Sequence, residues 1–185
     1  MADFTDVLTE AHVAFIAKQP VFFVATAAEG TRINLSPKGY DAFRVLGPNR
    51  VLWLDLGGSG NETQAHLVAD GRITIMFCAF DNPAWILRIY GKGQPIHPEE
   101  EGFAPLAALF PRLPGVRQIF DIAVESVQTS CGWGVPQMSL ERERPTLVKY
   151  HGQQVPAERL AKIAGRTRSI DGLPVRVQTL IPDWD

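Results

Sequence analysis

The chain has 185 residues and a formal net charge of −2, with 45% hydrophobic and 21% charged residues. This length and balance predict one globular domain, residues 1–185, around one hydrophobic core. No stretch of Lys and Arg offers the basic stripe that a nucleic-acid-binding protein needs, and no run of 18 apolar residues could cross a membrane. We therefore expect neither nucleic acid nor a membrane as a partner.

The start of the chain and its two cysteines bear on its location. Asp3 and Asp6 stand where a signal peptide would carry basic residues, and no apolar core follows them. Cys78 and Cys131 are too few for a disulfide framework, and free thiols are typical of a reducing compartment. The sequence therefore predicts a cytoplasmic protein.

Hydrophobic periodicity, turn residues and helix caps predict short strands joined mainly in hairpins, with short helices between them. Such a pattern is typical of a mainly β, α+β fold that forms a closed or nearly closed antiparallel barrel, and it disfavours a doubly wound parallel sheet. In chain order we expect a helix over 9–19, strands over 21–28, 31–36, 43–46 and 51–56, a helix over 62–69, strands over 73–80 and 85–90, a helix over 97–110, a strand within 119–129 and a helix over 156–166.

A glycine-rich loop, Gly58 to Thr63, stands between a predicted strand and a predicted helix. Small residues let backbone amides approach a ligand, and the start of a helix attracts a phosphate. The loop is not the dinucleotide fingerprint, which would need a glycine at Thr63, nor a P-loop. From spacing alone, an ordinary connection capped by Asn61 is the favoured interpretation.

A strand with one polar face is the second candidate. Arg32, Asn34 and Ser36 alternate with Ile33 and Leu35, and Lys38 follows after Pro37. These groups could serve the edge of a flavin ring and its phosphate. From alternation alone, a solvent-facing barrel surface is the favoured interpretation.

Other residues give weaker signals. Trp133 stands between Gly132 and Gly134 and could stack on a flat ring, or it could end a strand in the core. None of the four histidines is spaced with Cys, Asp or Glu as in a metal site, so no metal is expected. Cys131 fits a small buried residue better than a nucleophile.

Several segments together resemble the pyridoxamine 5'-phosphate oxidase family over about residues 10–135. Residues 21–27 and 33–39 resemble its opening hairpin, residues 51–56 and 58–67 its central strand, phosphate loop and helix, and residues 72–77 and 87–93 its next two strands. The resemblance implies a flavin mononucleotide (FMN)-binding split β-barrel that forms a homodimer with FMN at the subunit interface. A dimer would also cover the apolar strand faces expected at Ile73–Phe80 and Ile119–Val127.

The resemblance also implies which residues hold FMN. Residues from Arg32 to Lys38 would contact the flavin and ribityl chain, Trp53 to Asp55 would lie beside the ring, Ser59 to Gln64 would take the phosphate, and Trp133 would reach in from the partner subunit. The residues assigned to FMN on this basis are Arg32, Asn34, Leu35, Ser36, Pro37, Lys38, Trp53, Leu54, Asp55, Ser59, Gly60, Asn61, Glu62, Thr63, Gln64 and Trp133.

The chain departs from the family pattern at two places. Thr63 and Gln64 replace an Arg-Lys pair of the phosphate helix, so a cation from elsewhere must help; Lys38 is the first choice, then Arg32 or Arg88. The substrate signature of the authentic oxidase is missing from the tail, which argues against a vitamin B6 phosphate as substrate. We expect an FMN-dependent oxidoreductase that transfers hydride through flavin N5 to a small-molecule substrate. The alternative is a protein that binds a flavin, deazaflavin F420 or haem without turnover.

Overall fold

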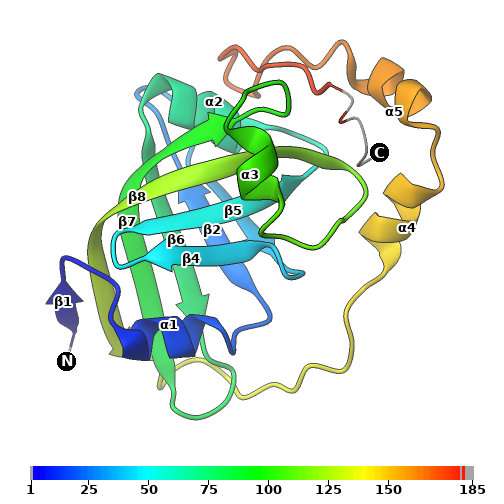
Figure 1. The fold of residues 1–185 in the computed structure, drawn as a ribbon. Helices are drawn as coiled ribbons and strands as arrows, with labels where there is room; N and C mark the ends of the chain where they lie inside the picture. Colours follow the sequence, from blue (N-terminus) through cyan, green and yellow to red (C-terminus); the bar gives the residue numbers. More distant parts are fainter. Residues whose placement is uncertain (1, 180, 182–185) are drawn as a thin grey trace.

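The computed structural model describes residues 2–179 and 181, and its strands form one antiparallel sheet (Figure 1). Seven of its eight strands run in the order β3-β2-β6-β7-β8-β5-β4, and the eighth, β1, pairs with β8 outside this path. The strands are β1 (Asp3–Thr5), β2 (Phe22–Thr26), β3 (Asn34–Lys38), β4 (Phe43–Gly47), β5 (Arg50–Leu56), β6 (Arg72–Cys78), β7 (Trp85–Ile96) and β8 (Val116–Cys131). The helices are α1 (Glu10–Ile16), α2 (Glu62–Ala69), α3 (Phe103–Ala107), α4 (Thr146–Gly152) and α5 (Pro156–Ile163). The expected mainly β, antiparallel class is confirmed.

Aromatic side chains show that the sheet curls into a barrel. Phe22 of β2 lies 5.2 Å from Phe43 of β4, measured between ring centroids, although these strands belong to opposite ends of the sheet order. Phe43 also meets Phe77 at 5.1 Å, and Trp53 meets Phe120 at 4.7 Å. These rings fill the barrel interior, and aromatic contacts of this kind add to the free energy gained from burial.

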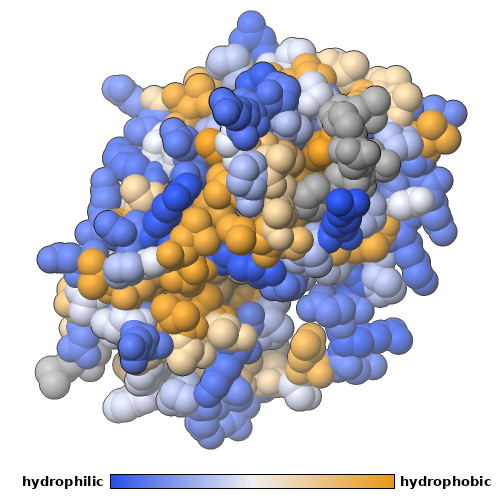
Figure 2. Space-filling view, viewed as in Figure 1, coloured by the Kyte–Doolittle hydropathy of each residue, from blue (hydrophilic) through white to orange (hydrophobic). Residues whose placement is uncertain are grey.

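Partly buried apolar side chains extend this core to the surface: Phe43, Val45, Leu56, Ile96, Leu106 and Leu113. Figure 2 shows apolar side chains gathered around a hollow on the face that carries α3 and β4. The strand faces at Ile73–Phe80 and Ile119–Val127 are covered within the chain, since residues such as Ile75, Ile119 and Val127 are fully buried. The expectation that these two faces need a partner subunit is therefore wrong.

Several predicted boundaries are also wrong. Residues 91–93 do not end β7, which continues to Ile96 through an irregularity between Tyr90 and Gly91. β3 continues through Pro37 to Lys38, because proline is tolerated on an edge strand, where its missing N–H is not needed. Only Phe103–Ala107 of the predicted helix over 97–110 is helical, and β1 and α4 were not predicted.

The C-terminal segment, residues 145–179, contains α4 and α5 and reaches the end of the barrel where α2 begins (Figure 1). Two backbone contacts fix its course, because Ile170 N donates to the Glu62 carboxylate and Arg176 N donates to Gln64 Oε1. Within the described residues, no helix is long and apolar enough to span a bilayer.

Candidate functional site

The polar face of β3 points inward. In β2, Phe22, Val24 and Thr26 are buried, and they pair with Lys38, Ser36 and Asn34 respectively. Directly paired residues of antiparallel strands share one face of the sheet. The three polar side chains of β3 therefore face the barrel, while Leu35 and Pro37 face outward. The solvent-facing interpretation of this strand is wrong.

Three of the predicted segments meet at this end of the barrel. Asn34 Nδ2 donates a hydrogen bond of 3.2 Å to Thr63 Oγ1, which joins β3 to the start of α2. The ammonium of Lys38 lies 4.9 Å from the ring centroid of Trp53, which joins β3 to β5. β3 thus contacts both the start of α2 and β5.

A buried network holds the loop in place. Asp55, only 1% exposed, accepts hydrogen bonds of 2.8 Å from Arg117 Nε and from Gln118 Nε2. Gln118 Nε2 also donates to Asn61 Oδ1 at 2.8 Å, and Arg117 Nη1 donates to Gly60 O at 2.8 Å. A buried carboxylate requires such partners. Asn61 does not cap α2 with its side chain, as its predicted role required, but binds Gln118 instead.

Thr63 and Gln64 are buried, and their side chains form hydrogen bonds within the protein. Gln64 Nε2 donates to Gln118 Oε1 at 3.0 Å, and Gln64 Oε1 accepts from Arg176 N at 2.8 Å. Thr63 accepts from Asn34. These two side chains join α2 to β8, β3 and the C-terminal segment rather than offering groups to a ligand.

None of the three cations expected to serve the phosphate reaches the loop. Lys38 lies over Trp53, where burial lowers the pKa of its ammonium despite the opposing charge of Asp55. Arg32 forms an ion pair with Asp171, and Arg88 donates to Ser130 Oγ at 3.2 Å. None of them lines the cavity beside the loop.

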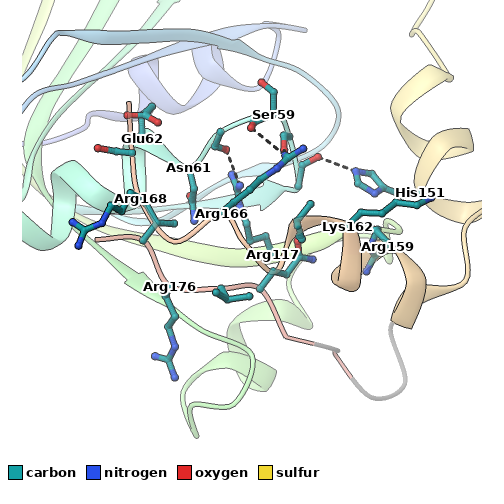
Figure 3. Close-up of a pocket in the computed structure, with 18 of the residues that line it drawn as sticks. Ser59, Asn61, Glu62, Arg117, His151, Arg159, Lys162, Arg166, Arg168 and Arg176 are labelled. Carbon is teal, nitrogen blue, oxygen red and sulfur yellow. Dashed lines mark hydrogen bonds between the residues drawn. The ribbon is translucent and has the colours of Figure 1, made fainter. Parts of the chain in front are cut away.

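That cavity has a volume of about 640 Å³. One wall is the loop from Gly57 to Glu62, and the other is the C-terminal segment (Figure 3). Figure 3 shows Arg166 extending across to the loop, where its Nη1 donates to Gly58 O at 3.2 Å and to Ser59 O at 3.1 Å. The basic residues that line the cavity are Arg117, Arg159, Lys162, Arg166, Arg168 and Arg176. Glu62 is the one acidic residue among the described lining residues.

His151 anchors the second wall. Its Nε2 lies 2.8 Å from Gly57 O, and its buried ring lies against Gly115, whose own O accepts from Gly57 N at 2.8 Å. α4 is thereby fixed to the first residue of the loop.

Two predicted residues lie elsewhere. Trp133 is 87% exposed and follows the end of β8 that pairs with Trp85, whereas the other end of β8 pairs with Leu56, just before the loop. Within one chain, Trp133 is not brought to the site. The side chain of Leu54 is fully buried in the core. The described residues contain no group of three or more His, Cys, Asp or Glu side chains that could hold a metal.

Sequence reasoning missed Arg117, Gln118 and Arg166. Arg117 and Gln118 belong to a strand that was expected within 119–129. Arg166 was expected to end a helix over 156–166, but it lies beyond α5, which ends at Ile163. A signal existed in the basic residues that recur from Arg159 to Arg176, but its meaning depends on where that segment packs.

Comparison with known proteins places this fold. The family model described as pyridoxamine 5'-phosphate oxidase matches residues 8–131. The pyridoxamine 5'-phosphate oxidase family protein ustO of Aspergillus flavus is 36% identical over 177 residues, covering 85% of this chain and 71% of that protein.

Two solved structures share the architecture. A pyridoxamine 5'-phosphate oxidase-like protein from Lactobacillus delbrueckii superposes with a TM-score of 0.54 at 18% identity, covering 66% of this chain and 94% of its own. A single-residue variant of HupZ from Group A Streptococcus superposes with a TM-score of 0.52 at 17% identity, covering 66% of this chain and 98% of the HupZ chain. The expected split-barrel fold is confirmed, and residues after 131 lie outside the matched family domain.

Proposed function

Because the chain belongs to the pyridoxamine 5'-phosphate oxidase family, we propose that it is a homodimeric, FMN-dependent oxidoreductase acting on a small-molecule substrate. The observation that carries the proposal is the meeting of β3's polar face, Trp53–Asp55 and the glycine-rich loop at one end of the barrel. Sequence segments far apart in the chain thus combine into one polar site beside an aromatic residue.

The residues present fit the parts of FMN. Asn34 and Ser36 offer hydrogen-bonding groups on the inward face of β3, and the Lys38 ammonium has no hydrogen bond to another described residue. In the loop, the N–H groups of Gly58 to Asn61 donate to no other described residue, so they remain available to phosphate oxygens. Such amides, polar side chains and one cation complement a polar ring edge and an anionic tail.

Bound FMN would supply hydride transfer through N5, while the protein supplies position and charge. Trp53 is buried, so it would fix the orientation of a neighbouring ring. Lys38 would hold positive charge beside that ring, and the Asp55–Arg117 pair would hold the loop. The proposed cofactor contacts are those of Asn34, Ser36, Lys38, Trp53, Asp55 and residues 59–62.

The absorption spectrum of the purified protein tests the cofactor. We expect the two-band spectrum of an oxidised flavin, or tight uptake of added FMN with quenching of its fluorescence. A haem Soret band, the single band of F420, or a protein that leaves FMN fluorescence unchanged would contradict the proposal.

Anaerobic addition of NADH or NADPH separates an enzyme from a binding protein. An oxidoreductase should bleach the flavin bands and regain them when an electron acceptor is added. A bound flavin that stays oxidised with every reductant tested would instead support binding without turnover.

A further inference from the structure

The loop by itself offers too little positive charge for a phosphate. A phosphate monoester carries about 1.5 to 2 negative charges at neutral pH, whereas the start of a helix supplies about half a positive charge. Thr63 and Gln64, which follow the loop, are uncharged and buried. The remaining positive charge must come from side chains that reach the loop from other parts of the fold.

The C-terminal segment supplies those side chains. Lys162, Arg166 and Arg168 line the cavity opposite the loop, and all three lie beyond residue 131, where the match to the family domain ends. Arg166 is in direct contact with the loop through the carbonyl oxygens of Gly58 and Ser59. The cavity therefore combines a wall from the family domain with a wall from the chain that follows it.

The charges of this cavity are unbalanced. Arg117 is neutralised by Asp55, and Arg176 forms ion pairs with Glu99 and Glu100. By contrast, Lys162, Arg166 and Arg168 have no carboxylate partner among the described residues. Three unpaired cations face one lining carboxylate, Glu62, and this excess matches a doubly charged anion.

We propose that this cavity binds a phosphate monoester dianion between the amides of Gly58 to Asn61 and the Arg166 guanidinium, with Lys162 and Arg168 at its rim. A guanidinium suits this role because its planar set of donors matches phosphate oxygens. The phosphate belongs either to FMN or to a phosphorylated substrate. Only the first source rests on the proposed function.

Titration of purified protein with FMN, riboflavin and inorganic phosphate tests the site in wild type, Arg166→Met, Glu62→Gln and Arg142→Met. Arg142 is exposed just before the C-terminal segment and does not line the cavity, so its variant controls for the loss of one charge. Arg166→Met should weaken binding of the phosphate group about ten- to a hundredfold, as expected for a charge-assisted hydrogen bond. Glu62→Gln should strengthen it, because a repelling charge is removed while an acceptor for Ile170 N is kept.

The ligands identify the source of the phosphate. If the phosphate is that of FMN, Arg166→Met weakens the binding of FMN but leaves the binding of riboflavin unchanged. Inorganic phosphate then binds the riboflavin complex but not the FMN complex. If it belongs to a substrate, inorganic phosphate binds the FMN complex and Arg166→Met removes that binding. Phosphate binding without any flavin binding would support this site while contradicting the proposed cofactor. Equal affinities in Arg166→Met, Glu62→Gln and Arg142→Met would overturn the inference.

Discussion

The surroundings of Lys38 disfavour the charged form of its side chain. Its side chain points inward from β3 onto Trp53, and its ammonium donates no hydrogen bond to another described residue. Burial lowers its pKa, and attraction to Asp55 only partly opposes this. A cation in such a place without a hydrogen-bond acceptor is typical of a ligand-binding position, because a ligand can supply the missing hydrogen bond.

Replacing Lys38 with Met should change how stability depends on pH. Since the folded-state pKa lies below the unfolded value, the unfolded chain binds more protons between these two values, and the stability of the wild type rises with pH across that window. Met keeps the apolar stem over Trp53 but does not titrate. The free energy of unfolding of the variant, relative to that of the wild type, should therefore be highest near neutral pH. This difference should shrink as the pH approaches about 10.5.

Urea unfolding of both proteins at several pH values, without flavin, measures this difference. Lys18→Met is the control, because Lys18 is exposed on the surface. A Lys38→Met difference that stays constant over the whole range would show that Lys38 is not buried as described.

Among the elements, α4 packs against a glycine at which any side chain would be strained. Gly115 has φ +81°, and a Cβ built there would lie 2.3 Å from the His151 ring. His151 in turn contacts Gly57 O, the first carbonyl of the loop. The close packing against one glycine thus helps to position α4, at the start of the segment that carries the basic wall.

Gly115→Ala should weaken the attachment of α4 to the loop, because it displaces His151. Left-handed backbone costs an alanine about 1–3 kcal/mol, and the His151 ring would also have to move. We expect a lower unfolding temperature and faster proteolysis within residues 132–152, both relative to wild type. Gly47→Ala is a suitable control, since no atom lies within 4 Å of its added Cβ. Equal proteolysis of the two variants would contradict this role of Gly115.

The sequence predicted local elements well and their partners poorly. α2 was predicted over its observed range, Glu62–Ala69, because Asp70-Gly71 ends it. Residues 91–93 looked like a break in a strand, but glycine is needed at 91 because a Cβ there would lie 2.1 Å from Ala123 O. That requirement comes from the paired strand β8 and is invisible in local sequence.

The candidate site shows the same limit. Alternation in residues 32–38 predicted a polar face, but only the pairing of β3 with buried β2 residues shows that it points inward. Arg166 binds the loop across 107 residues of sequence. Such long-range packing cannot be read from residue spacing, so Lys38 was preferred for a phosphate although its side chain does not line the cavity beside the loop.

At the scale of the whole molecule, the outward face of β3 is left uncovered. Leu35 of this edge strand is 65% exposed, and Ile33, just before the strand begins, is 77% exposed. Large apolar side chains in neighbouring outward positions are typical of an interface. These two side chains give a new reason to expect a dimer. The earlier reason, the apolar faces at Ile73–Phe80 and Ile119–Val127, does not hold because those faces are buried within the chain.

We therefore expect a homodimer at micromolar concentration, with Leu35 in the interface. In a two-fold dimer a substitution removes the same side chain from both subunits, and burying one Leu contributes about 1.5–3 kcal/mol. Leu35→Lys should therefore raise the dimer dissociation constant by about two to four orders of magnitude. Sedimentation velocity measures the change. Leu140→Lys is the matched control, because Leu140 is 63% exposed but lies outside the barrel strands. A monomeric wild type would contradict the dimer, and a dimer that survives Leu35→Lys but not Leu140→Lys would place its interface elsewhere.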